Sequence, residues 1–279
     1  MAYEGPQDPE DLFFRVMIFR IFNRISTWEA LERVSGSVSW QDFDFRAASR
    51  ALHTLMGSNE RVYSAAYIMP SPQFGADRKH DNHLLLLEWM MKHDFPGRIR
   101  QAESLQDVYL LLRTAPSLGP FLAFQMTIDL NYSSLLDFDE NDFVVAGPGA
   151  LSGIRKCFTD VDGFSAEDTI RWMVDTQWDH FDRLELPYRN LYGRDLKLID
   201  CQNLFCETDK YARVKHPDIH GIGSRTKIKQ HFSALVGETP VTPFFPPKWG
   251  LEIPALDAPS DSNENSRGPL PRVLHHQAA

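Results

Sequence analysis

Residues 114–158, TAPSLGPFLAFQMTIDLNYSSLLDFDENDFVVAGPGALSGIRKCF, join two apolar helical patterns through a short turn and continue through an acidic loop to Gly-Pro-Gly. Leu118 is the apolar residue of the turn and is expected to pack back between the two helices. Gly119 permits a positive φ or a close backbone approach, and Pro120 suits a first helical position, where its missing N–H costs nothing. The free N–H groups at such a helix N-terminus predict a turn that binds phosphate without a positive side chain.

Helical patterns also dominate the rest of the chain. Ser26 and Glu29 have the spacing of a capping box, and Ser165, with Asp168 three residues on, begins the longest helical pattern. Only RVYSAAYIM, residues 61–69, has the composition of a short strand. The sequence therefore predicts an all-α fold of many helices, with the turn described above forming a hairpin of two of them.

The composition changes along the chain and predicts four regions. Residues 1–9 are an N-terminal extension, and residues 10–235 form the helical domain. Residues 236–257 are rich in proline and aromatic residues, which suits an extended arm lying on the domain surface. Residues 258–279 have few apolar side chains and are predicted to be disordered and dispensable.

Charge and cysteine content limit the classes of function. The 279 residues carry a formal net charge of -9, so bulk attraction to nucleic acid or to an anionic membrane is not expected, and DNA binding needs a local patch or backbone groups. The three cysteines are Cys157, Cys201 and Cys206, without a Cys-x-x-Cys pair. This pattern favours a reducing, intracellular compartment over a disulfide framework or a zinc site. No secretion signal or membrane span is apparent, and neither a metal ion nor a cofactor is predicted.

Gly147-Pro148-Gly149 is a second candidate anion site. Its glycines would let the backbone approach a ligand, the following helix would point N–H groups at that ligand, and Arg155 and Lys156 are nearby in the sequence. A Gly-Lys-Ser/Thr sequence is missing, so this is not a nucleotide-binding P-loop. The alternative is a tightly packed connection from the loop into the helix.

The helical segment CQNLFCETDKYARVKH, residues 201–216, places Asn203, Glu207 and Lys210 on one face. These groups could perform acid–base chemistry, and the alternative is a solvent-exposed Glu–Lys pair. We expect Glu207 and Lys210 to lie in one cleft with Asp142 of the acidic loop, with the Gly147–Gly149 turn at its rim. Lys210 would then bind a phosphate or pyrophosphate leaving group, and Glu207 would be the general base.

The turn resembles the helix-hairpin-helix of DNA base-excision glycosylases. Pro116, Leu118, Gly119 and Ala123 match that motif in register, whereas Ser117 replaces its first glycine. In those enzymes a catalytic aspartate follows the hairpin, at the start of the next helix. Here Ala146-Gly147 stands at that place, which argues against simple glycosylase chemistry. The acidic residues at that distance are Asp137, Asp139, Glu140 and Asp142.

Five segments, taken in order, resemble the helical domain of phage 5-hydroxymethyluracil DNA kinases and the related glutamyl/putrescinyl-thymine pyrophosphorylases. They are FFRVMIFRIFNRISTWE, AAYIM, GPFLAFQMTIDLNYS, DFVVAGPGA and NLFCETDKYAR, and the resemblance covers roughly residues 10–215. It implies a glycosylase-like helical domain whose partner is DNA containing a modified pyrimidine. It does not imply kinase activity, because that requires a P-loop.

Three functions follow as hypotheses. The first is an enzyme that flips a modified pyrimidine into a helical cleft, with the chemistry carried by Asp142, Glu207 and Lys210. In that hypothesis the phosphate contacts are Leu118, Gly119, Pro120, Gly147, Gly149, Arg155 and Lys156. The second is a catalytically inactive DNA-binding module on the same scaffold. The third is a protein-interaction module that uses the proline-rich arm.

Overall fold

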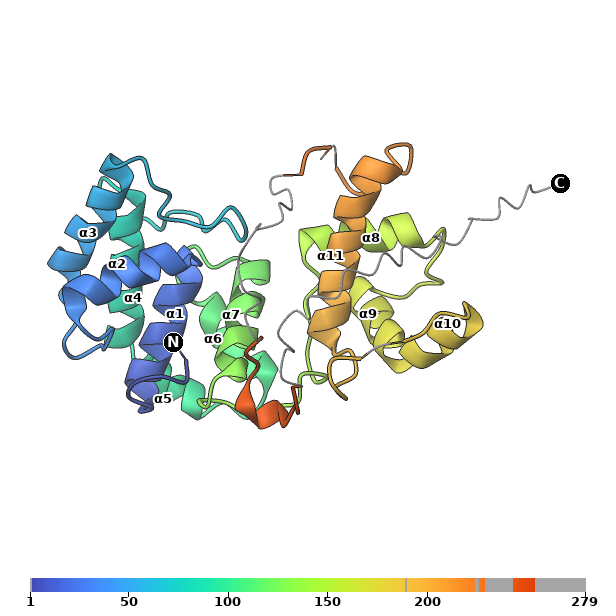
Figure 1. Ribbon diagram of the computed structural model, residues 1–279, viewed down its shortest axis with the longest axis horizontal. Helices are drawn as coiled ribbons and strands as arrows, with labels where there is room; N and C mark the ends of the chain where they lie inside the picture. Colours follow the sequence, from blue (N-terminus) through green and yellow to red (C-terminus); the bar gives the residue numbers. More distant parts are fainter. Residues whose placement is uncertain (1, 189, 224–225, 229–242, 254–279) are drawn as a thin grey trace, which may run out of the picture.

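The computed structural model describes residues 2–188, 190–223, 226–228 and 243–253 (Figure 1). Within these ranges the chain is all-helical, as predicted, and contains no β-strand beyond one isolated bridge. The elements are α1 (Pro9–Phe22), α2 (Ile25–Ser35), α3 (Phe45–Gly57), α4 (Lys79–Lys92), α5 (Phe95–Arg100), α6 (Leu105–Arg113), α7 (Pro120–Tyr132), α8 (Pro148–Cys157), α9 (Ala166–Asp175), α10 (Gln177–Arg183), α11 (Leu198–Lys215) and the 3-10 helix η1 (Pro247–Trp249).

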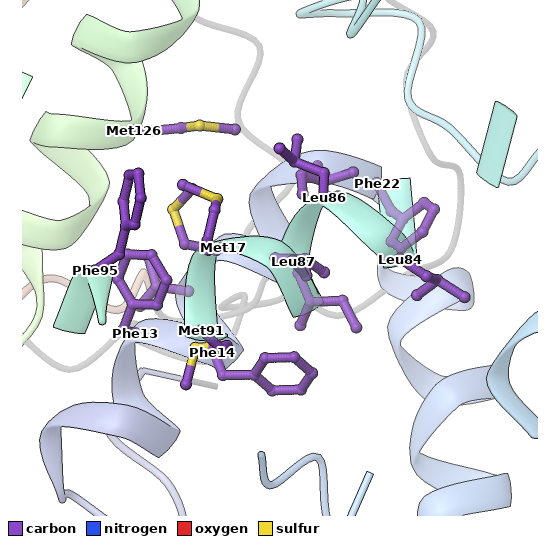
Figure 2. Close-up of a cluster of buried hydrophobic side chains, with 14 of the residues drawn as sticks. Phe13, Phe14, Met17, Phe22, Leu84, Leu86, Leu87, Met91, Phe95 and Met126 are labelled. Atoms are coloured by element: carbon purple, nitrogen blue, oxygen red, sulfur yellow. The ribbon is translucent and has the colours of Figure 1, made fainter. Parts of the chain in front are cut away.

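Two apolar cores organise these helices into two lobes. Figure 2 shows part of the first core, in which Phe13 and Phe14 of α1 pack with Leu87 of α4 and Phe95 of α5. The second core joins α8, α9 and α11 to the other side of α7. Its buried members are Phe124, Ile128, Val144, Ala150, Ile154, Ile170, Leu198, Ile199, Cys201 and Phe205. In Figure 1, α1–α5 lie on one side of α6 and α7, and α8–α11 lie on the other side.

Helix α7 is the wall that the two cores share. Ala123, Met126 and Leu130 belong to the first core, whereas Phe124 and Ile128 belong to the second. Successive residues are about 100° apart around a helix, so these two apolar faces leave a boundary between them on each side. Figure 1 shows α7 between the lobes, and residues on its boundaries belong to neither core. Polar residues can be accommodated there without entering either core.

The capping predictions had mixed outcomes. Ser165 and Asp168 form the predicted capping box at the start of α9. The predicted box at Ser26 does not form, because α2 already begins at Ile25, and the Ser26 hydroxyl instead accepts a hydrogen bond from Arg24 Nε at 2.8 Å. The long helix expected from Ser165 is divided at Thr176 into α9 and α10.

The predicted strand over 61–69 is an irregular segment that crosses the ends of α1 and α2. Two of its main-chain groups bond to these helices rather than to a neighbouring strand. The Val62 carbonyl accepts from Thr27 Oγ1 at 2.8 Å, and the Ser64 N–H donates to the Phe22 carbonyl at 2.9 Å. The segment between α3 and α4 is thereby tied to the first lobe.

His83 of α4 fixes the far end of the same segment. Its Nδ1 lies 2.7 Å from the Tyr63 hydroxyl and its Nε2 lies 2.8 Å from the Pro70 carbonyl oxygen. Both contacts suit a neutral ring that donates from Nε2 and accepts at Nδ1. Burial lowers the pKa of His83 to about 4, opposed by the hydrogen bond to Pro70.

We predict that this histidine makes the fold less stable in mild acid. Between the unfolded pKa near 6.5 and the folded pKa, the unfolded chain binds a proton that folded His83 does not, so stability falls as the pH falls through this window. From pH 7 to pH 5 the free energy of unfolding should decrease by about 2 kcal/mol more in the native protein than in a His83→Gln variant. Urea titrations at both pH values measure this difference, and parallel pH dependences would contradict it.

The described part of the predicted arm, residues 243–253, packs against the C-terminal end of α7. Trp249 lies edge-on to Tyr132 at 5.2 Å between ring centres, and the Arg194 guanidinium lies 4.1 Å from the centre of a Trp249 ring. Lys248 Nζ donates to the carbonyls of Asn131 and, at 2.7 Å, Leu136. The predicted disordered tail, 258–279, lies outside the described residues. Within the described ranges, no helix has the length and apolarity needed to cross a bilayer.

Candidate functional site

In the hairpin of α6 and α7, the turn leucine packs as predicted, but the positive φ lies at a different residue from the predicted one. Leu118 is buried between the helices, with 3% of its surface exposed. The positive φ falls on Ser117, at 65°, whereas Gly119 has an ordinary extended conformation, with φ -69° and ψ 169°. A Cβ atom added to Gly119 would have no heavy atom within 4 Å. Gly119 therefore keeps the surface in front of the turn open rather than permitting the turn itself.

The N-terminus of α7 has an open surface next to it. Gly119 is the N-cap and supplies no side-chain hydrogen bond, and Pro120 has no N–H, so the next amides are without a side-chain cap. A hollow of about 570 Å³ lies over this end, with Arg113 at its edge. Its lining residues are Pro70, Arg113, Ala115, Ser117, Leu118, Gly119, Pro120, Phe121 and Leu122. An uncapped helix N-terminus beside a guanidinium is suited to an anion.

The Gly147-Pro148-Gly149 turn serves helix packing. The Gly147 N–H donates to Gln202 Oε1 at 3.2 Å. A Cβ on Gly147 would lie 2.5 Å from Cδ2 of Phe121, and one on Gly149 would come closer than 3.0 Å to the sulfur of Cys206. These glycines let α8 approach α7 and α11 closely. This agrees with the alternative considered above, a tightly packed connection from the loop into the helix.

The two basic residues predicted beside this turn lie at the other end of α8. Arg155 is exposed in the last turn of the helix. Lys156 is 6% exposed, and its ammonium lies 2.9 Å from Oδ1 of Asp209. Because its charge is used inside the second lobe, Lys156 is not placed to bind a phosphate.

Asp142 is not brought together with the Glu207–Lys210 pair. The Asp142 side chain is exposed, and its loop contacts the beginning of α11, where the Leu198 N–H donates to Asn141 Oδ1 at 3.3 Å. Glu207 is nine residues further along that helix, about 14 Å at 1.5 Å per residue. The predicted common cleft is therefore not formed.

Glu207 and Lys210 contact each other on the surface of α11. Glu207 Oε1 lies 2.5 Å from Lys210 Nζ, and the side chains are 65% and 41% exposed. Burial lowers the pKa of Lys210, but the hydrogen bond that it donates to Glu207, together with nearby ionisable groups that include Tyr67, outweighs burial and raises the pKa overall. Lys210 thus stays a cation and lies close to the segment between α3 and α4.

Another carboxylate of the acidic loop, Glu140, is buried. It lies 2.7 Å from Arg194, which also pairs with Asp200 at the start of α11 at 2.7 Å. Burial raises the pKa of Glu140, and the charge of Arg194 opposes that shift. This cluster anchors the loop to the second lobe, beneath Trp249.

A polar cluster that the sequence did not reveal lies between the lobes. Arg20 Nε of α1 lies 2.7 Å from Asp129 Oδ2 of α7, and another nitrogen of the same guanidinium donates to Gln125 Oε1 at 3.0 Å. The guanidinium also lies 4.3 Å from the centre of the Tyr67 ring. That ring is stacked on Phe121, with 6.0 Å between centres and 16° between planes. Burial raises the pKa of Asp129, while Arg20 opposes this shift.

We call this cluster the inter-lobe site: Arg20, Tyr67, Phe121, Gln125 and Asp129. It adjoins the second lobe, because the Phe121 ring contacts Gly147 and Tyr67 lies within electrostatic range of Lys210. One sequence signal could have indicated it. Phe121, Gln125 and Asp129 follow one another at intervals of four residues, which puts two polar groups on one face of an otherwise apolar helix.

No cluster in the described part of the chain groups three or more His, Cys, Asp or Glu side chains so that they could hold a metal ion. Residues 1–221 match the model of a protein family described as the helical domain of 5-hmdU DNA kinase. Searches of curated proteins and of solved structures found no match.

Proposed function

The chain belongs to the 5-hmdU DNA kinase helical-domain family, and on that premise we propose that it recognises or acts on 5-hydroxymethyluracil or a related modified thymine in DNA. The base would be flipped out of the duplex and held at the inter-lobe site. Extrusion of this kind gives a protein access to atoms that are hidden inside the base stack.

The observation that carries this proposal is the meeting of five distant segments at one place. The segments named above as similar to this family contribute Arg20, Tyr67, Phe121 with Gln125 and Asp129, Gly147, and Lys210. The first three segments form the inter-lobe site, and the last two adjoin it. A polar cluster with a raised carboxyl pKa and an unsatisfied buried amide supports a ligand-binding role.

DNA would be held through backbone groups. The uncapped N-terminus of α7 and its neighbouring hollow offer amides to a phosphate, which suits a chain with a net charge of -9. Phe121 links this end of α7 to the inter-lobe site. A phosphate bound at the hairpin would thus place a neighbouring base near Tyr67.

Two carboxylates are candidates for acid–base chemistry. Asp129 is partly buried and its pKa is raised, which favours proton transfer. Glu207 remains the general base predicted from the sequence, with Lys210 holding a phosphate leaving group. Both side chains have the exposure of a surface ion pair. Glu207→Gln and Asp129→Asn distinguish the two, since loss of turnover in only one variant assigns the base.

A second candidate function is a DNA-binding module without catalysis. Ala146 stands where a glycosylase-like domain would place its aspartate, and Asp142 lies apart from Glu207 and Lys210. This alternative keeps the hairpin and the inter-lobe site as recognition elements only.

Nucleoside mass spectrometry tests the proposal directly. The protein is incubated with duplexes containing thymine, 5-hydroxymethyluracil or its phosphorylated form, and binding to each duplex is measured at one salt concentration. Turnover supports an enzyme, and preferential binding without turnover supports a recognition module. Equal binding to all three duplexes without turnover would overturn the proposal.

We predict that Gly119→Val weakens DNA binding about tenfold, because a branched side chain at the open turn covers amides that donate to phosphate. Its φ is ordinary and its Cβ has free space, so the melting temperature should change little. Gly57→Val in α3 is the matched control, since its Cβ also has free space and α3 lies apart from the α6–α7 hairpin (Figure 1). Equal affinities in gel-shift titrations of the two variants would refute the hairpin contact.

A further inference from the structure

We propose that Gln125 and Asp129 read the hydrogen-bonding edge of a uracil-type base whose ring takes the place of the Tyr67 ring against Phe121. The inference rests on the proposed function and goes beyond it, because it assigns base specificity to two side chains of α7. It also makes Tyr67 the group that fills the site in the absence of DNA.

The amide of Gln125 is the first observation. Gln125 is 4% exposed, and its Oε1 accepts from Arg20 at 3.0 Å. A guanidinium only donates hydrogen bonds, so the amide oxygen must face Arg20 and the NH₂ group must point elsewhere. That NH₂ group has no hydrogen-bond partner among the described residues. A buried donor without an acceptor is unfavourable, and a ligand oxygen would satisfy it.

The other polar residues of α7 show that this lack is local. Thr127 and Asn131 are equally buried and belong to the opposite boundary of the helix. The Thr127 hydroxyl donates to the Ala123 carbonyl at 2.9 Å. Asn131 uses both ends of its amide on the main chain of Phe138, at 3.0 Å each. Gln125 lies on the face of α7 that carries Phe121, against which the Tyr67 ring is stacked.

Asp129 supplies the complementary acceptor. Arg20 occupies its Oδ2 and leaves Oδ1 able to accept a hydrogen bond. Asp129 is one turn beyond Gln125, so the two polar groups are neighbours on the helix surface. A donor beside an acceptor matches the O4 and N3–H of a uracil-type base. Cytosine presents the reverse pattern, an N4 donor beside the N3 acceptor, and would meet donor with donor.

Tyr67 occupies a position that a flat ligand could fill. Its ring is stacked on Phe121 and covers the guanidinium of Arg20, which in turn holds Gln125 and Asp129. Stacking on an aromatic face and on a guanidinium are both interactions that a base ring can replace. Tyr67 also has a φ of 52°, a left-handed conformation that is unfavourable for a residue with a Cβ. A displacement that also took its backbone out of this conformation would relieve that strain.

Gln125→Glu is the direct test, because it keeps the shape and replaces the NH₂ group by an oxygen. Binding is measured for duplexes that contain one 5-hydroxymethyluracil or one 5-hydroxymethylcytosine at the same position. We expect the native protein to prefer the uracil-type base, and Gln125→Glu to lose at least tenfold in affinity for it while cytosine-type binding is unchanged or improved. Gln106→Glu, the same change at an exposed position of α6, should keep the preference.

Tyr67→Ala is the second test. Unlike Gln125→Glu, it introduces no charge into a buried position. Because the base would have to displace the Tyr67 ring, removing that ring should raise the affinity for the uracil-type duplex several-fold. A fall in affinity would show that Tyr67 contacts the base, and would overturn the proposal that the base displaces it. A native preference that survives in Gln125→Glu overturns the reading role and leaves the proposed function intact. Absence of any preference in the native protein overturns the reading role, and absence of turnover as well overturns the proposed function.

Discussion

Asp209→Asn is expected to lower the free energy of unfolding by about 3 kcal/mol, because it leaves a buried ammonium without its counter-charge. Asp209 of α11 is 1% exposed and accepts from Ser152 Oγ at 2.7 Å. Lys156 of α8 lies 2.9 Å away, and Arg213 also pairs with the same carboxylate. The amide of asparagine would keep some hydrogen bonds, but Lys156 would remain charged in a site that is 6% exposed. Urea unfolding at neutral pH measures the loss.

Glu88→Gln is the matched control for this prediction. Glu88 lies 2.8 Å from Lys92 on α4, nearly the same separation as in the Asp209 pair, but its partner is 63% exposed. Solvent screens exposed pairs, so this change should cost less than about 0.5 kcal/mol. Similar losses in the two variants would show that burial does not determine the strength of the Asp209 cluster.

The sequence predicted the fold class because the helices have local signals. Apolar spacing, the Ser165–Asp168 capping box and Pro120 at a helix start act within a few residues, and each appears in the structure. The segment over 61–69 was assigned wrongly because its conformation is imposed from a distance. Its main chain bonds to Thr27 and Phe22, and no local pattern encodes those partners.

The candidate site was less predictable, since its contacts join remote parts of the chain. Arg20 and Asp129 are on different helices, and pattern analysis of either helix alone cannot pair them. The role of the glycines was also ambiguous in the sequence. The absence of a Cβ at Gly149 indicated a close approach, but the sequence could not say whether the partner was a ligand or, as found, Cys206 of α11.

Gly153→Ala is expected to destabilise the protein by about 3 kcal/mol, although alanine is the better helix former. Gly153 lies in the middle of α8, where the helix meets α11. A Cβ at this position would come closer than 3.0 Å to both the carbonyl oxygen and the carbonyl carbon of Phe205. These are main-chain atoms inside another helix, so the clash cannot be relieved by rotating a side chain. The two helices would have to separate, which opens the second core.

Gly57→Ala distinguishes this clash from the general effect of replacing a helical glycine. Gly57 is the last residue of α3, and a Cβ there would have no heavy atom within 4 Å. That variant should be neutral or slightly more stable, by up to about 0.5–1 kcal/mol, because alanine restricts the unfolded chain. Guanidinium unfolding of the two variants gives the comparison. If Gly153→Ala were as stable as Gly57→Ala, α8 and α11 could not be in backbone contact at Phe205.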